Sequence, residues 1–165
     1  MVDAFDAAFR WVLEAEGPDS NDPDDPGGLT RFGIAQRKHP ELDVRTVTEE
    51  GARHHYRRHY WDPIQGDQLP RVTALVVFDG AVNHGRRRSV LWLQEALGVQ
   101  TDGLVGPKTV ASAHTLGLAI VPRYLRLRAR AYVDLAASKP VFLKYLNGWL
   151  ERLFRVQQRA LQEDL

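Results

Sequence analysis

Apolar residues near the start of the chain recur three or four positions apart, which is the spacing of one helix face. They are Ala4, Phe5, Ala8, Phe9, Val12 and Leu13. Asp3 stands where a helix N-cap belongs, and Gly17 with Pro18 supplies a stop signal after Glu16. The pattern therefore predicts an amphipathic helix over residues 3–16.

The rest of the chain predicts further helices joined by short loops. Thr48, followed by two glutamates, opens a second helix that runs to about Tyr60. Residues 33–38 predict a short turn or helix, and a small β-hairpin, if present, belongs in residues 17–47. The later helices are expected over residues 70–82, with a stop at residues 83–85, and over residues 89–97, 108–116, 118–137 and 140–164, the last with a break near Asn147 and Gly148. We expect an all-α fold of roughly seven or eight helices, forming one compact domain over residues 1–165.

Composition excludes several classes of protein. Of the 165 residues, 44% are hydrophobic and 26% are charged, which is typical of a globular domain and not of a disordered chain. No apolar run approaches the ~18 residues of a membrane span, so we expect no stable membrane insertion. Residues 1–6 lack a basic and apolar secretion signal, which predicts synthesis in the cytoplasm without a signal peptide. Because cysteine is absent, disulfides and thiolate chemistry are excluded.

Charge is distributed unevenly along the chain. Residues 1–50 carry 5 Lys/Arg against 12 Asp/Glu, whereas residues 51–165 carry a net charge of +8. A basic body beside an acidic loop suits a polyanionic partner, and both bacterial cell wall and nucleic acid qualify. Solvated surface charge is the simpler interpretation of most of these residues taken one by one.

The stretch after the first predicted helix carries the strongest candidate for chemistry. Glu16 stands at the helix end, eight residues separate it from Asp25, and Thr30 follows. A Pro- and Gly-rich loop that returns a carboxylate and a hydroxyl toward a first carboxylate can hold an acid and a water on opposite sides of a bond. Glycoside hydrolysis needs this arrangement. As a proton donor, Glu16 is expected to be buried beside an apolar residue such as Trp11 or Trp61.

Simpler interpretations of this stretch compete with catalysis. Glu16 could be an exposed helix-end glutamate, and Glu14 is its natural decoy. The four loop aspartates fit turns beside Pro and Gly, or a calcium site, although they miss the EF-hand spacing. They are Asp19, Asp22, Asp24 and Asp25.

The sequence does not decide the roles of three further clusters of polar residues. The histidines His54, His55 and His59 lie on one predicted helix, but a zinc site would need ligands that are not adjacent, so a basic solvated face is the alternative. Residues 86–88 are three arginines that could bind phosphate or nucleic acid. Asp79 and Asn83 lie four apart on an apolar helix, where they either anchor the core or line a cleft.

Several ordered motifs together resemble one protein family, glycoside hydrolase family 108. Glu16–Gly17 and Phe78–Gly85 are two of them, and the others are Asn21–Asp22–Pro23, Asp25–Pro26–Gly27–Gly28, Thr30, Gly33–Ile34 and Tyr60–Trp61–Asp62–Pro63. Residues 93–109 are similar to the segment that this family carries as a predicted peptidoglycan-binding region. The resemblance covers residues 4–160 and implies a lysozyme-like N-acetylmuramidase of the kind found in phage lysis cassettes.

The resemblance also implies roles for individual residues. The family's catalytic acid is the glutamate of a Glu-Gly-Gly motif, which is Glu16 here, although Pro18 replaces the second glycine. The spacing from Glu16 to Asp25 is similar to that of phage-type lysozymes, in which an aspartate and a threonine flank the water side of the sugar. Thr30 comes one residue earlier than in those enzymes. The saccharide cleft is expected to include Tyr60, Trp61, Asp79 and Asn83.

The implied function is that of an endolysin. It would cleave the β-1,4 bond between N-acetylmuramic acid and N-acetylglucosamine, with residues 4–90 as catalytic segment and residues 91–165 as a helical segment resembling a peptidoglycan-binding region. The resemblance implies that the protein needs no cofactor or metal. It also implies peptidoglycan rather than nucleic acid as the partner, a monomeric state, and a holin for export to the cell wall. The alternatives are a non-catalytic wall-binding module, a lysis or secretion regulator that keeps the fold, and a nucleic-acid binder.

Overall fold

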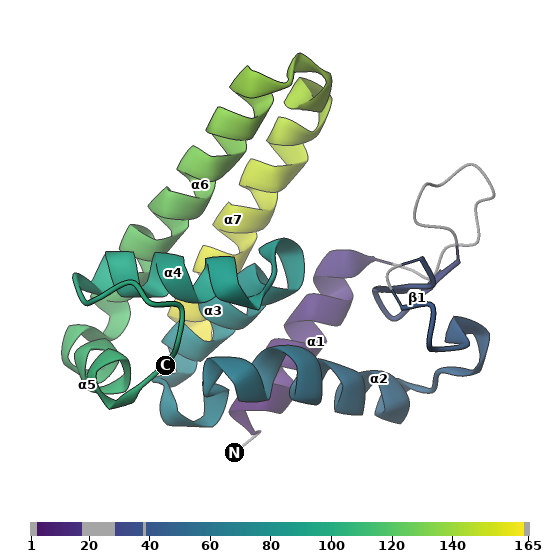
Figure 1. Ribbon diagram of the computed structural model, residues 1–165, viewed down its shortest axis with the longest axis horizontal. Helices are drawn as coiled ribbons and strands as arrows, with labels where there is room; N and C mark the ends of the chain where they lie inside the picture. The colour runs from purple at the N-terminus through teal and green to yellow at the C-terminus, as the bar shows by residue number, and fades with distance from the viewer. Residues whose placement is uncertain (1–2, 18–28, 38, 164–165) are drawn as a thin grey trace. The chain divides into compact units, whose positions relative to one another are not determined.

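The computed structural model describes residues 3–17, 29–37 and 39–163 (Figure 1). Contacts between residues divide the chain into two compact units, residues 1–59 and residues 60–165, called the N-terminal and C-terminal units below. The fold is mainly α with one small sheet, which confirms the predicted class. Among the described residues, none of the helices combines the length and the apolar character needed to cross a membrane.

The N-terminal unit begins with helix α1, Ala4–Glu16. Its apolar stripe is buried, and the Asp3 carboxylate accepts a hydrogen bond of 3.3 Å from the Phe5 amide, which caps the first turn. The helix stops after Glu16 because Gly17 takes a φ of +80°, a conformation that glycine adopts without strain. The predicted helix over residues 3–16 is therefore confirmed at both ends.

A two-stranded antiparallel hairpin follows, with β1 at Thr30–Arg31 and β2 at Ile34–Ala35. Its two central residues, Phe32 and Gly33, have φ angles of +51° and +74°, which is the type I′ turn that matches the twist of paired strands. The hairpin lies inside the predicted window of residues 17–47. The prediction of a turn or helix over residues 33–38 is wrong at β2, because pairing with β1 holds these residues extended.

Helix α2, Glu49–Tyr56, completes the N-terminal unit and packs against α1. Thr48 caps it as predicted, accepting a hydrogen bond of 3.1 Å from the Gly51 amide. The rings of Phe9 and Tyr56 lie 5.5 Å apart, and Arg53 donates to Asp6 at 2.7 Å, so both apolar and ionic contacts join the two helices. A 3₁₀ turn at Val44–Thr46 precedes α2, and a π-helical segment at Arg57–Trp61 follows it.

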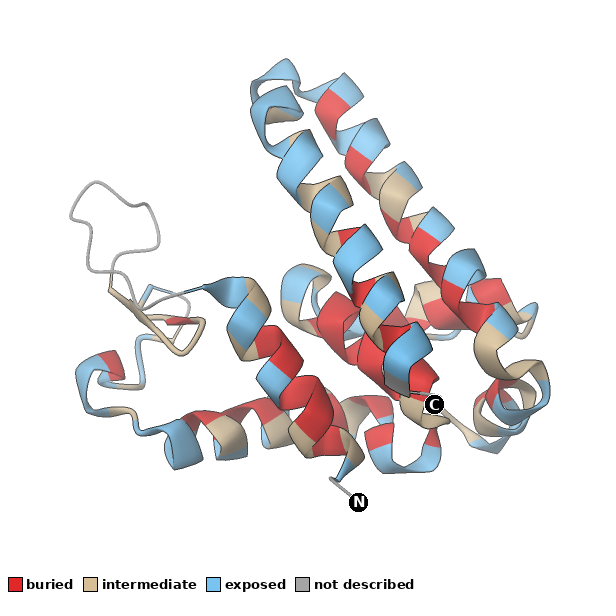
Figure 2. Ribbon diagram, turned by 180° about the vertical axis from the view of Figure 1, so that it is seen from behind, coloured by how far each residue is buried: buried red, intermediate tan, exposed pale blue. Residues whose placement is uncertain are grey.

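The C-terminal unit is built around α3, Arg71–His84, which is buried along almost its whole length (Figure 2). A helix that is apolar on every face belongs in the centre of a core. Helices α4, α6 and α7 pack against it, and α5 packs against α4. Their bounds are Arg86–Leu97 for α4, Pro107–Leu116 for α5, Ile120–Ser138 for α6 and Leu143–Glu163 for α7.

Two predictions about this unit need correction. Helix α4 begins at Arg86, three residues before the predicted start at Ser89. The break expected near Asn147 and Gly148 is absent, and α7 runs through both residues. A glycine inside a helix costs only about 1 kcal/mol, which the packing of α7 against α3 and α6 outweighs.

In the described part of the C-terminal unit, two short 3₁₀ turns precede α3 and two link later helices. They lie at Asp62–Ile64, Gly66–Gln68, Gly117–Ala119 and Pro140–Phe142.

Candidate active site

Glu16 lies against the turn of the β-hairpin. A Cβ atom added to Gly33 would lie 2.8 Å from Cγ of Glu16 and 2.5 Å from the Tyr56 hydroxyl. Glycine is therefore required at position 33 twice, for its positive φ and for the space that it leaves. The end of α1, the hairpin turn and the last residue of α2 meet at this point.

Tyr56 ties the hairpin turn to helix α2. Its side chain is buried, and its hydroxyl donates a hydrogen bond of 3.1 Å to the carbonyl oxygen of Phe32, the residue before Gly33. This bond satisfies a carbonyl that the tight turn would otherwise leave to solvent. Tyr56 thus holds the turn in place beside Glu16.

Of the three predicted catalytic residues, the structure describes Glu16 and Thr30. Glu16 is exposed, so the expected burial beside Trp11 or Trp61 is wrong. Trp11 is buried, more than one helical turn before Glu16, and Trp61 belongs to the C-terminal unit. Thr30 is half-buried at the start of β1, opposite Ala35, on the hairpin whose turn Glu16 contacts. Asp25 and the other loop aspartates lie outside the described residues.

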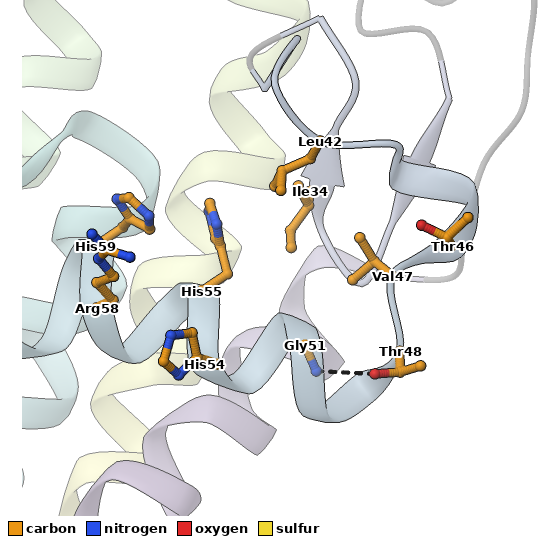
Figure 3. Close-up of a pocket in the computed structure, with 10 residues that line it drawn as sticks. All are labelled: Ile34, Leu42, Thr46, Val47, Thr48, Gly51, His54, His55, Arg58 and His59. Atoms are coloured by element: carbon orange, nitrogen blue, oxygen red, sulfur yellow. Dashed lines mark hydrogen bonds between the residues drawn. The ribbon is translucent and has the colours of Figure 1, made fainter.

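A pocket of about 310 Å³ opens next to this hairpin (Figure 3). Ile34, which directly follows Gly33, lines it together with apolar residues of the segment leading to α2. Side chains of α2 and of the π-helical segment form the rest of the lining. The lining residues are Ile34, Leu42, Thr46, Val47, Thr48, Gly51, His54, His55, Arg58 and His59.

The three predicted zinc candidates differ in exposure. His54 and His59 are exposed, whereas His55 is buried with its ring 4.5 Å from the rings of both His39 and His59. Burial lowers the pKa of His55 to about 4, and the neighbouring His39 and His59 add to this shift. Among the described residues, no group of three histidine, cysteine or acidic side chains is arranged to hold a metal ion.

The predicted saccharide contacts belong to the C-terminal unit. Trp61 is fully buried, donates from Nε1 to Asp67 at 2.8 Å and meets the Phe78 ring at 5.5 Å, so it belongs to the core of its unit. This burial argues against stacking of Trp61 on a sugar ring. Tyr60 is half-buried, and Asn83 is exposed, so both remain candidates.

Asp79 lies at the centre of a buried charge cluster with Arg128 and Arg152. Arg128 donates to Oδ2 of Asp79 at 2.7 Å, and Arg152 donates twice to Oδ1, at 2.8 and 3.0 Å. Burial alone would raise the pKa of Asp79, but the two guanidinium groups outweigh it and hold this pKa below its usual range. Of the two interpretations offered by the sequence, the structure favours a core anchor over a cleft residue.

Sequence reasoning assigned no role to four of the residues described above, although Gly33 belongs to one of the motifs that carry the family resemblance. Gly33 has a local signal, because a glycine as second central residue is typical of a type I′ hairpin turn. Tyr56 has no local sequence signal, because its hydrogen-bond partner, Phe32, lies 24 residues earlier in the chain. Arg128 and Arg152 lie 49 and 73 residues from Asp79, and no local pattern pairs residues at such distances.

Comparison with known proteins gave matches along most of the chain. Residues 9–85 match the family model described as "Glycosyl hydrolase 108", and residues 88–154 match that described as "Predicted Peptidoglycan domain". Among solved structures, SagA of Brucella abortus is similar, with 30% sequence identity and a TM-score of 0.80. That match covers 96% of this chain and 94% of SagA. A search of curated protein sequences gave no significant match.

Proposed function

Because the chain belongs to the glycosyl hydrolase 108 family and carries that family's peptidoglycan segment, we propose that it is an N-acetylmuramidase. It cleaves the β-1,4 bond between N-acetylmuramic acid and N-acetylglucosamine in the glycan strands of peptidoglycan. The observation that supports this most is the position of Glu16, an exposed carboxyl group at a helix end that lies against a tight hairpin turn.

In the proposed mechanism, Glu16 protonates the glycosidic oxygen as that bond breaks. Asp25 and Thr30 are assigned the second role, in which they orient the attacking water or stabilise the positive charge that develops on the ring. An exposed acid on a fixed support suits this role, because general acid catalysis depends on placing the proton within hydrogen-bond reach of the leaving oxygen. Gly33 and Tyr56 supply the support.

Residues outside the N-terminal unit are proposed to hold the substrate. Tyr60 and Asn83 offer side-chain surface for saccharide contacts. Residues 91–165 bind the wall, and the net charge of +8 on residues 51–165 attracts the anionic polymers of the wall. The site of action is accordingly the bacterial cell wall.

Replacement of Glu16 tests this proposal. Glu16→Gln keeps the size and polarity of the side chain but removes the transferable proton, so wall lysis should fall by ~10²–10⁴ with the fold unchanged. The assay is loss of turbidity of purified wall, or of bacteria with a permeabilised outer membrane, with circular dichroism as the check on folding.

Glu14→Gln is the matched control for this experiment. Glu14 is also exposed and lies two residues earlier on the same helix, so its replacement changes the net charge equally. It should leave the rate of lysis near that of the wild type. Full activity of Glu16→Gln, or equal losses in both variants, would refute the role of Glu16.

A further inference from the structure

The pocket beside the hairpin lies next to the proposed cleavage site. Gly33 contacts Glu16, and the following residue, Ile34, lines the pocket. All described lining residues belong to the N-terminal unit, so the relation between Glu16 and the pocket is internal to that unit. Glu16 and the pocket therefore adjoin consecutive residues of the same hairpin.

The lining of the pocket combines an apolar side with a basic side (Figure 3). Ile34, Leu42 and Val47 supply aliphatic surface from the hairpin and from the segment before α2. Three histidines and one arginine come from α2 and the π-helical segment: His54, His55, Arg58 and His59. No aspartate or glutamate occurs among the described residues that line the pocket. The lining therefore favours a ligand that carries both an anionic group and small apolar groups.

Arg58 is the group that would recognise the anion. Its guanidinium is exposed at the pocket, stays charged at any physiological pH, and has the planar fork of donors that matches a carboxylate. The imidazoles of His54 and His59 add further N–H donors. His55 is neutral at neutral pH, so it contributes a polar ring and no charge.

The lining chemistry of the pocket favours a peptide over a further sugar. Among the described residues, the lining offers aliphatic side chains and no phenyl, phenol or indole face for a sugar ring to stack on. Its volume is about 310 Å³, enough for a small segment of a ligand. In peptidoglycan, the muramic acid residue carries a short peptide with alanine methyl groups and free carboxylates, which has the required combination of chemistry.

We propose that this pocket binds a carboxylate-bearing part of the peptide attached to N-acetylmuramic acid, with Arg58 as the carboxylate ligand. The inference rests on the proposed function and extends it: the chain would recognise the peptide as well as the glycan. Cleavage is then faster on peptide-bearing strands than on bare ones.

The test compares two soluble substrates of equal sugar length, one with the muramic acid peptides and one from which they have been removed. The wild type should show a lower KM for the peptide-bearing substrate. In Arg58→Ala this preference should shrink by about tenfold or more through KM, because hydrogen bonds to charged groups contribute that much. Arg58→Lys should retain part of it, and kcat on the bare substrate should not change.

Arg45→Ala is the matched control, since Arg45 is an exposed arginine of the same unit that does not line the pocket. It should keep the wild-type preference. Equal preference for both substrates in the wild type would overturn the proposal, as would an equal loss of preference in Arg45→Ala. An Arg58→Ala variant that loses activity equally on both substrates would also contradict it.

A binding measurement separates this inference from the proposed function. Calorimetry with the Glu16→Gln variant and a muramyl tetrapeptide should show binding that Arg58→Ala weakens, whatever the catalytic rate. Absence of cleavage of both substrates by the wild type would refute the muramidase activity alone. Equal affinity of Glu16→Gln for the muramyl tetrapeptide and for the same sugar without its peptide would refute the role of the pocket. It would leave the proposed muramidase activity unaffected.

Discussion

Two carboxylates, one in each unit of the molecule, lie in opposite environments. In the N-terminal unit, Glu16 is exposed at a helix end and lies against a tight turn. In the C-terminal unit, Asp79 is fully buried and both of its oxygens accept hydrogen bonds from arginines. A carboxyl group that exchanges a proton with a substrate must be reachable, whereas one enclosed by two guanidinium groups can only hold its neighbours in place.

The physical cost of the two arrangements also differs. A buried charge is tolerated only when it is paired, and removal of one partner leaves the other charge without compensation. An exposed carboxylate stays hydrated and has no such desolvation cost, so a substitution of Glu16 should cost less stability than one of Asp79. The comparison therefore predicts that substitutions in the C-terminal cluster mainly lower stability, while those around Glu16 also lower the rate of the reaction.

The largest loss of stability is expected for Asp79→Asn. The substitution leaves Arg128, which is fully buried, without its anionic partner. The Nε and Nη2 atoms of Arg128 already have no hydrogen-bond partner in the described part of the structure. We expect a decrease of about 3–5 kcal/mol in the free energy of unfolding, measured by urea titration.

Asp134→Asn provides the control for this measurement. Asp134 forms an exposed ion pair with Arg130 at 3.7 Å, and exposed pairs of this kind contribute little. The control should unfold at the wild-type urea concentration. An Asp79→Asn variant with wild-type stability would contradict the role of Asp79 as a core anchor.

Gly33→Ala should affect both stability and activity. The positive φ costs alanine about 1–2 kcal/mol, and the new Cβ would displace Glu16. Gly98→Ala has a similar φ of +70° with nothing within 4 Å of its Cβ, so it should show the cost of the positive φ alone and keep full activity. Urea unfolding and wall lysis measured on both variants separate the two effects. Equal activity of the two variants would show that the hairpin turn does not position Glu16.

Tyr56→Phe should have a smaller effect of the same kind. It removes the hydrogen bond to the Phe32 carbonyl, which costs about 1 kcal/mol, and frees the hairpin turn to move. The rate of wall lysis should fall moderately while the helical circular dichroism signal stays constant. Unchanged lysis would mean that the turn keeps its position without this bond.

The smallest predicted effect is a pH dependence of the free energy of unfolding. One histidine of each unit contributes to it, His55 in the N-terminal unit and His84 in the C-terminal unit. Burial lowers the pKa of His55 and of His84 to about 4, from 6.5 for the ordinary side chain. Between these values the unfolded chain binds more protons than the folded chain, so the free energy of unfolding decreases as pH falls from about 6.5 to about 4. His84→Gln should reduce this slope in urea titrations at several pH values. An unchanged slope would show that His84 does not titrate differently on folding.

The parts of the fold predicted correctly from the sequence are those that depend on neighbouring residues. The caps Asp3 and Thr48 and the stop at Gly17 act within one or two turns of a helix, so local patterns reveal them. The hairpin strands have two residues each, which is too short for any periodicity to appear. Only the wider window around them could be predicted.

The candidate site was predicted in part for the same reason. Glu16 is indicated by its position at the end of a helix, Thr30 by its place in the loop that follows, and both by the family resemblance. Asp25 lies outside the described residues. The support from Gly33 and Tyr56, like the pairing of Asp79 with Arg128, depends on contacts between distant parts of the sequence. Burial also depends on such contacts, which explains why the expectation of a buried Glu16 was wrong.

Mass analysis of wall fragments released by the protein tests the central claim most directly. A muramidase that uses Glu16 as acid should generate fragments with hydrolysed, reducing N-acetylmuramic acid ends, and Glu16→Gln should not. New reducing ends at N-acetylglucosamine, anhydro ends on muramic acid, or free peptides in place of sugar fragments would contradict the proposed activity.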